Sequence, residues 1–124
     1  EKALNAFFTV AYHNYKFALE GIEEPQYAEY TEGNHYDWHC DSGDTPDGDR
    51  DLSASLILSA PYEYKGGSLE FRDLHTFPNP EEKRGRLIVF PSMLIHRVPE
   101  VTEGKRKSLV LWGVRSKKKF QTSK

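Results

Sequence analysis

His39 and Asp41 have the residue types and the spacing to share a metal ion. They lie at the end of the segment Tyr30–Asp41, which reads YTEGNHYDWHCD. If this segment is a strand, the two side chains project from the same face, about 7 Å apart along the backbone. An imidazole and a carboxylate need one further imidazole to form the facial triad that binds non-haem Fe(II) and leaves open positions opposite. The segment therefore predicts two of the three ligands of an iron site.

The candidate for the third ligand is His96, which lies in the apolar segment 93–98. Ten residues further on, Arg106 carries a guanidinium group that can bind a carboxylate through two hydrogen bonds. Gly104 can supply a turn, so we expect His96 and Arg106 on neighbouring strands of one hairpin. Each residue alone also fits a structural histidine or a surface arginine, and it is the spacing that favours a site.

The elements that must position these side chains are predicted to be one helix and about seven strands. Apolar residues recur with helical spacing from Leu4 to Leu19, and Gly21 and Pro25 follow, so we expect a helix over 2–20. Short runs rich in aromatic and β-branched residues come next. They predict strands at 27–31, 35–41, 53–59, 68–72, 86–90, 94–98 and 107–114.

One helix followed by many short strands favours a mainly β (α+β) fold, in which a barrel or sandwich carries the helix on its outside. The 124 residues are too few for a second core, so we expect a single domain over 1–124 with its barrel at about 27–115. An exposed, mobile loop is expected at 42–51 and a second loop at 74–85. The basic tail 115–124 is expected to be solvated, with binding to a polyanion as the alternative.

Composition limits the compartment and the partners. The single cysteine, Cys40, cannot form an internal disulfide, so secretion into an oxidising compartment gains no support and a cytoplasmic location is favoured. The longest aliphatic or aromatic runs, such as Leu87–Phe90, are far shorter than the roughly 20 residues that cross a bilayer, so no membrane partner is expected. The chain begins at Glu1 without a methionine, so we expect the natural protein to have further N-terminal sequence.

The formal net charge of −2 conceals a strong asymmetry along the chain. Residues 1–51 hold 12 acids and three bases, whereas residues 83–124 hold two acids and 12 bases. Asp41 belongs to the acidic part and Arg106 to the basic part, so folding has to bring opposite charges to one site.

These motifs resemble the Fe(II)- and 2-oxoglutarate-dependent dioxygenases and, within them, the prolyl 4-hydroxylase group. The resemblance covers roughly residues 27–115. Its motifs are Tyr-x-x-Gly-x-x-Tyr-x-x-His-x-Asp at 30–41, Arg-x-x-Ser at 50–53, Gly-Gly-x-Leu at 66–69, Phe-Pro-Ser at 90–92 and His-x₉-Arg-x₅-Trp at 96–112. The fold that it implies is the double-stranded β-helix, a jelly-roll or cupin-like barrel whose mouth holds the metal.

The resemblance also implies roles for nine residues. Fe(II) would be bound by His39, Asp41 and His96. The cosubstrate 2-oxoglutarate would contact Arg106 and Tyr30 through its distal carboxylate and Leu69 through its methylenes. The peptide substrate would meet Tyr36, Arg50 and Trp112, with plain packing or a surface salt bridge as the alternative for these three. Strict strand alternation places Tyr36 opposite His39, so we expect a bulge near Gly33.

The implied activity is hydroxylation of an unactivated C–H bond of peptidyl-proline, of the procollagen-proline 4-hydroxylase type. It would consume 2-oxoglutarate and O₂, release succinate and CO₂, and use ascorbate as reductant. Hydroxylation of lysyl residues or of a free amino acid stays open, as does a non-catalytic cupin-like module that binds a metal and a small acid. The expected partner is a proline-containing peptide or protein, the expected state is a monomer, and no nucleic acid is expected.

Overall fold

The computed structural model describes residues 2–16, 18–41, 50–72 and 79–115, which form one α-helix followed by ten strands. The helix is α1 (Lys2–Tyr15). The strands are β1 (Leu19–Ile22), β2 (Gln26–Tyr30), β3 (Tyr36–His39), β4 (Leu52–Ile57), β5 (Tyr64–Gly66), β6 (Glu70–Phe71), β7 (Leu87–Pro91), β8 (His96–Val98), β9 (Val101–Gly104) and β10 (Arg106–Arg115). One turn of 3₁₀ helix, Pro61–Glu63, precedes β5. The expectation of a mainly β chain with one N-terminal helix is confirmed.

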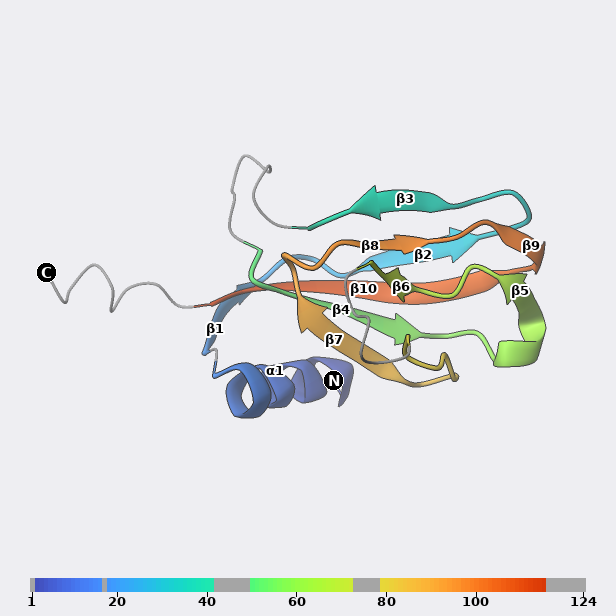
Figure 1. Ribbon diagram of the computed structural model, residues 1–124. Coiled ribbons are helices and arrows are strands. Elements are labelled where there is room, and N and C mark those ends of the chain that lie inside the picture. Colours follow the sequence, from blue (N-terminus) through green and yellow to red (C-terminus); the bar gives the residue numbers. More distant parts are fainter. Residues whose placement is uncertain (1, 17, 42–49, 73–78, 116–124) are drawn as a thin grey trace, which may run out of the picture.

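The strands form two facing sheets and a separate two-stranded ribbon, and all of their pairings are antiparallel. The larger sheet has the order β1-β10-β4-β7, and β2 also pairs with β10. The smaller sheet has the order β3-β8-β6, and β5 and β9 form a short ribbon. Figure 1 shows β3 and β8 on one side of the long strand β10, with α1 on the other side. The space between the two sheets is therefore bordered by strands that are far apart in sequence.

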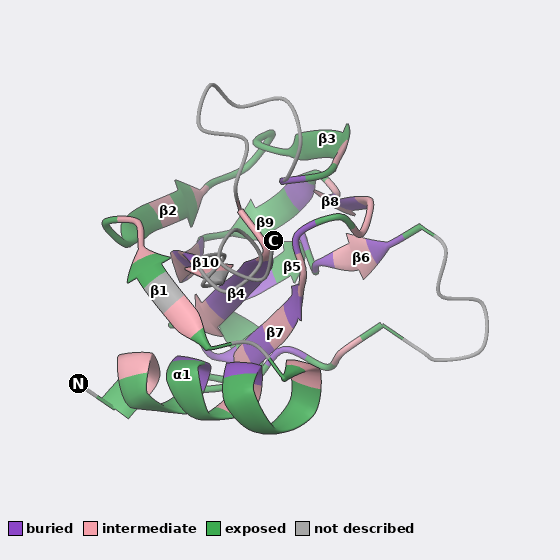
Figure 2. Cartoon of the chain, turned by 90° about the vertical axis from the view of Figure 1, so that its left-hand side faces the viewer, coloured by how far each residue is buried: buried purple, intermediate pink, exposed green. Residues whose placement is uncertain are grey.

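Strand alternation in the larger sheet divides the core into two parts. One set of side chains points between the sheets and packs there with residues of the smaller sheet: Ile57, Leu69, Phe71, Ile88, Phe90 and Val98. The other set points outward and packs against α1: Leu52, Ala54 and Leu111 meet Phe7 and Ala11. Figure 2 shows these buried stretches on β4 and β7 and on the face of α1 that meets the sheet. The helix thus covers the outer face and leaves the inner face to the site.

The helix is shorter than the predicted range 2–20. It ends at Tyr15, and the next residue, Lys16, has a left-handed backbone with φ of 60°, a conformation that ends helices. Leu19 then pairs with β10 as part of β1. Leu19 therefore packs on the same core as the apolar residues of the helix, but it does so from a strand, which is why the apolar spacing extended the predicted helix too far.

Each of the seven predicted strands overlaps an observed strand, whereas β1, β5 and β9 were not predicted. The last two have three and four residues, and apart from Tyr64 and Val101 their residues are exposed. Such strands carry no alternating apolar pattern. Of the loops predicted at 42–51 and 74–85 and the tail predicted at 115–124, residues 42–49, 74–78 and 116–124 lie outside the described residues, and so does the mobility expected of the first loop.

The predicted hairpin between His96 and Arg106 is wrong. His96 begins β8 of the smaller sheet and Arg106 begins β10 of the larger sheet, so the two residues lie on facing sheets. Gly104 has φ of +80°, and a Cβ there would lie 2.0 Å from the carbonyl oxygen of Glu63. Glycine is required for this close approach of β9 to β5.

No helix in the described part of the chain has the length and apolarity needed to cross a membrane.

Candidate metal centre

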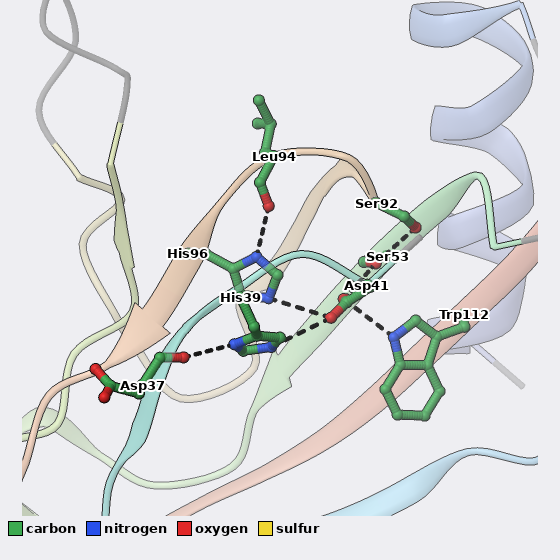
Figure 3. A network of polar contacts seen from close by, with 8 residues as sticks. All are labelled: Asp37, His39, Asp41, Ser53, Ser92, Leu94, His96 and Trp112. Carbon is green, nitrogen blue, oxygen red and sulfur yellow. Dashed lines mark hydrogen bonds and ion pairs between the residues drawn. The ribbon is translucent and has the colours of Figure 1, made fainter. Parts of the chain in front are cut away.

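His39, Asp41 and His96 meet between the two sheets, where His96 and Asp41 are buried and His39 is partly exposed. Their ligand atoms all lie within 4.8 Å of one another. The Nε2 atoms of His39 and His96 lie 3.3 and 3.4 Å from the same oxygen, Oδ1 of Asp41. His39 ends β3 and His96 begins β8, and these two strands pair with the two histidines in register. Figure 3 shows the three side chains converging on one point.

The backbone fixes which nitrogen each imidazole presents. Nδ1 of His39 lies 2.8 Å from the carbonyl oxygen of Asp37, and Nδ1 of His96 lies 2.8 Å from that of Leu94. A carbonyl only accepts hydrogen bonds, so each Nδ1 carries a proton and donates it. The lone pair of each neutral imidazole then lies on Nε2, which faces Asp41. Backbone partners of this kind orient metal-binding histidines.

Asp41 is held so that one oxygen remains for a further partner. Its Oδ2 accepts hydrogen bonds from Ser53 Oγ at 2.7 Å and from the indole nitrogen of Trp112 at 3.1 Å. Because the single proton of Ser53 points at Asp41, Ser92 donates its own to Ser53, at 2.8 Å. The backbone N–H of Asp41 also donates to Ser92 O at 2.8 Å. These contacts leave Oδ1 facing the two histidines, where it can bind a cation that the imidazoles also bind.

The electrostatics of the cluster favour a cation. Burial alone would raise the pKa of Asp41, but the hydrogen bond from Ser53, together with those that the two histidines donate when they are protonated, holds it well below its usual range. Burial alone would lower the pKa of His39, yet the Asp41 carboxylate and the Asp37 carbonyl raise it. A proton or a metal ion would serve as the positive partner of this anion. Two imidazole lone pairs and one carboxylate oxygen fit the 2-His-1-carboxylate set that binds Fe(II).

A pocket of about 170 Å³ extends from this cluster between the sheets. It contains eight of the nine residues to which the resemblance gave roles. They are Tyr30, Tyr36, His39, Asp41, Leu69, His96, Arg106 and Trp112. Every second residue of β10 from Arg106 to Trp112 lines it, because alternate residues of a strand share a face. Its walls thus connect the candidate metal ligands to Arg106.

Arg106 is buried, with a side chain only 2% exposed, and it has an ionic partner that the sequence did not indicate. Its Nε donates to Oε1 of Glu82 at 3.0 Å and its Nη2 donates to Oε2 at 2.9 Å. Among the residues that the structure describes, Nη1 has no hydrogen-bond partner. The guanidinium carbon lies 5.8 Å from the ring centre of Tyr30. Arg106 therefore keeps free donors in a pocket that could take an anion.

Tyr36 lies beside the cluster because β3 contains an irregularity. Tyr36 pairs with Val98 and His39 pairs with His96, so three steps on β3 match two on β8. This extra residue turns both side chains to one side, where the rings of Tyr36 and His39 have centres 4.0 Å apart. A bulge is present as expected, but it lies between Tyr36 and His39 and not near Gly33.

Arg50 does not line the pocket. It binds Glu23 through two hydrogen bonds of 2.7 and 2.8 Å, and its guanidinium stacks 3.9 Å above the ring of Trp112. The stacking supports one face of the indole whose N–H reaches Asp41. Arg50 thus lies behind Trp112, and the salt bridge that was the alternative for it is present.

Two contributors to the site were missed in the sequence. Ser53 closes the Arg-x-x-Ser motif at 50–53, and that motif was a signal from which its contact with Asp41 could have been sought. Glu82 had no such signal, because it lies among the charged residues 81–84 of a predicted loop. Only its position in the fold shows that it is buried.

Comparison with known proteins agrees with this geometry. Residues 25–113 match the family model described as 2OG-Fe(II) oxygenase superfamily. A PKHD-type hydroxylase of Prochlorococcus marinus is 38% identical over 80 residues, which cover 64% of this chain and 36% of that protein. The chain thus spans little more than a third of this relative's length.

Two solved structures share the architecture. A prolyl-4-hydroxylase of Pseudomonas putida matches with a TM-score of 0.71 and 28% identity, over 91% of this chain and 63% of that chain. A viral collagen prolyl hydroxylase from Paramecium Bursaria Chlorella virus-1 matches with a TM-score of 0.69 and 26% identity, over 94% and 70%. The predicted double-stranded β-helix with an outer helix is confirmed by this likeness.

Proposed function

The chain belongs to the 2OG-Fe(II) oxygenase superfamily, and we propose that it hydroxylates an unactivated C–H bond of a prolyl residue in a peptide. In this proposal 2-oxoglutarate and O₂ are consumed, succinate and CO₂ are released, and ascorbate serves as reductant. The prolyl hydroxylases among the solved structures support the substrate class. The donor set and the pocket support the reaction class.

The three residues of the cluster would hold Fe(II) through Nε2 of His39, Oδ1 of Asp41 and Nε2 of His96. Bound iron supplies the activation of O₂ that C–H hydroxylation requires. The chain itself supplies orientation: backbone carbonyls hold each imidazole, and Ser53 and Trp112 hold the second oxygen of the carboxylate. No described side chain is assigned as an acid, a base or a nucleophile.

The observation that carries the proposal is the buried guanidinium of Arg106 in the same pocket as the cluster. A buried donor without a partner costs about 1–3 kcal/mol, and a carboxylate entering the pocket would satisfy it. Leu69 offers an apolar wall for the methylenes of 2-oxoglutarate, and Tyr30 lies beside the guanidinium. A dicarboxylic 2-oxo acid that spans the cluster and Arg106 fits these contacts.

Aromatic side chains near the cluster favour a prolyl substrate. Tyr36 stacks on His39 with more than half of its surface exposed, and Trp112 lines the pocket beside Asp41. Aromatic surfaces bind proline-rich segments because those segments are extended and already ordered. Tyr36 and Trp112 would therefore contact the residue to be hydroxylated, and Arg50 would support Trp112 from behind.

The test is oxygen-dependent turnover of a library of random peptides by the purified protein with Fe(II), 2-oxoglutarate and ascorbate. We expect peptide-stimulated succinate release and the gain of one oxygen atom on proline, located by fragmentation in a mass spectrometer. Oxygen on lysine, or on a free amino acid supplied instead, would replace the prolyl part of the proposal. No succinate with any of these substrates would favour a non-catalytic binding module.

A further inference from the structure

Glu82 is a fully paired carboxylate buried behind Arg106. Its side chain is 2% exposed, although it lies outside the helices and strands. Oε1 accepts hydrogen bonds from the hydroxyl of Tyr64 and from Arg106 Nε, and Oε2 accepts them from the backbone N–H of Leu69 at 2.8 Å and from Arg106 Nη2. A carboxylate has about four acceptor positions, and all of those on Glu82 are occupied.

The pairing fixes the orientation of the guanidinium. A fork of two parallel N–H···O bonds defines the plane of the group as well as its position. Glu82 and Tyr64 do not line the pocket, whereas Arg106 and Leu69 do. The edge of Arg106 that carries Nε and Nη2 therefore faces Glu82, and the donors left for a ligand in the pocket are the two on Nη1 and the second one on Nη2.

Leu69 connects the Glu82–Arg106 pair to the part of the pocket wall that would contact the methylenes of 2-oxoglutarate. Its backbone N–H binds Glu82, while its side chain lines the pocket beside Arg106. Tyr64, which holds the other oxygen of Glu82, belongs to β5. Burial and the Glu82 carboxylate raise the pKa of Tyr64, so its hydroxyl stays a donor at neutral pH. Tyr64 and Leu69 thus hold Glu82 from two different places in the barrel, and through Glu82 they determine how far the Arg106 guanidinium reaches into the pocket.

The charge of the pair also affects selectivity. With Glu82 ionised, the pair with Arg106 has no net charge. A ligand anion is then attracted by oriented N–H groups rather than by an unpaired buried cation. The strength of this attraction depends on the distances and angles at which the oxygens of the ligand meet those N–H groups.

We propose that Glu82 is the positioning residue that holds Arg106 at a set distance from the candidate metal cluster and so determines the length of the 2-oxo diacid that is accepted. This inference rests on the proposed function, since it concerns the same pocket. We expect five-carbon 2-oxoglutarate, the cosubstrate of the proposed function, to bind best and the four-carbon oxaloacetate and six-carbon 2-oxoadipate to bind less tightly.

The experiment is calorimetric titration of the three diacids into the Mn(II)-loaded protein without iron, so that binding is measured and not turnover. We compare wild type with Glu82→Gln, which keeps the shape but turns an amide N–H₂ toward two donors, and with Glu82→Asp, which keeps the charge. Glu81→Gln is the matched control, because this neighbouring side chain is exposed and pairs only weakly with Lys83 at 3.8 Å.

Wild type and Glu81→Gln should prefer 2-oxoglutarate over both other acids. Glu82→Gln should weaken 2-oxoglutarate binding by about tenfold or more, as expected when a charge-assisted hydrogen bond is lost, and the three affinities should become similar. Glu82→Asp should retain more of the affinity than Glu82→Gln because it can still pair with Arg106. A purely structural role would reduce the folded fraction, measured by circular dichroism, and leave the ratios of the affinities unchanged.

Two negative results have different meanings. If wild type binds none of the three acids, the proposed function itself fails. If wild type binds 2-oxoglutarate and both Glu82 variants keep its affinity and its preference among the acids, the proposed function stands and the role of Glu82 is wrong. If Glu82→Gln does not fold, the comparison of Glu82→Asp with wild type decides: an unchanged preference overturns the inference, and a weakened one supports it.

Discussion

Trp112 donates its indole N–H to Oδ2 of Asp41 at 3.1 Å, so a strand of the larger sheet holds a candidate metal ligand that follows a strand of the smaller sheet. Together with Ser53, this bond occupies one oxygen of the carboxylate and leaves the other for the cluster. The contact thus couples the packing of the two sheets to the shape of the candidate metal site.

Trp112→Phe should weaken binding of a divalent metal by about 10–100-fold, the effect typical of losing a hydrogen bond to a metal ligand. The phenyl ring keeps most of the packing under Arg50, so the fold should persist. Calorimetric titration with Mn(II) measures the change. Trp38→Phe is the control, because Trp38 stacks with Arg97 and not with the cluster. Equal metal affinity in the two variants would show that the indole N–H does not support Asp41.

His96→Ala should abolish succinate release both with and without peptide, because one of the three candidate ligands is lost. His39→Ala should do the same. His13→Ala is the matched control, since His13 lies exposed near the end of α1. Succinate and peptide oxidation are measured in the same reaction. Turnover at the wild-type rate in either ligand variant would remove these histidines from the iron site.

Arg106→Met should destabilise the protein by about 3–5 kcal/mol, because it leaves the buried carboxylate of Glu82 without its ionic partner. The double variant Arg106→Met with Glu82→Gln should be less destabilised than the sum of the two single variants. Urea unfolding of the four proteins gives the coupling energy, expected at about 0.5–3 kcal/mol for groups in one network. If the two single losses in unfolding free energy simply add up in the double variant, the pairing of Arg106 with Glu82 contributes little to stability.

Gly104→Ala should destabilise the protein more than Gly33→Ala. Both glycines have positive φ, at +80° and +91°, so each substitution carries the cost of a left-handed residue, about 1–2 kcal/mol. A Cβ at Gly104 would also collide with the carbonyl of Glu63, whereas nothing lies within 4 Å of one at Gly33. The added overpacking should cost about 1–3 kcal/mol more, measured by urea unfolding. Equal losses would mean that β9 can move away from β5.

The stability contributed by Glu82 should depend on pH. Burial alone would raise the pKa of Glu82, but the hydrogen bonds and charge of Arg106 hold it below its usual value. A carboxyl with a lowered pKa in the folded state stabilises above its unfolded pKa, about 4.3 for Glu, and loses that effect as pH falls through the folded pKa. The gap in unfolding free energy between wild type and Glu82→Gln should therefore be largest near neutral pH and shrink in acid.

Urea unfolding at a series of pH values measures this gap. The exposed Glu81→Gln should differ little from wild type across the series. A gap for Glu82→Gln that stayed constant into acid, or grew there, would contradict an ionised Glu82 in the folded protein.

The candidate metal site could be predicted to the extent that its geometry is local. His39 and Asp41 are two residues apart, so strand alternation alone places their side chains on one face without any long-range contact. Tyr36 shows the limit of this reasoning, because the irregularity that turns it toward His39 depends on the pairing of β3 with β8.

Contacts between distant segments were predicted less well. The resemblance grouped His96 and Arg106 with the first two ligands, but spacing alone suggested a hairpin, whereas the two residues lie on facing sheets. Turn residues do not specify which partner a strand takes. The pairing of β9 with β5 and of β10 with β1, β2 and β4 required the whole barrel.

The sequence by itself determined the mainly β fold class, carried the motifs that resemble the family and named eight of the residues that line the pocket, because strand alternation and motif spacing are properties of short segments. Only the tertiary structure decided that Glu82 is buried against Arg106 and that Trp112 and Ser53 share one oxygen of Asp41. The physical reason is that a charged side chain in a loop is normally solvated, and its burial depends on donors supplied by distant strands. Here those donors come from Tyr64, Leu69 and Arg106, which only the closed barrel brings together.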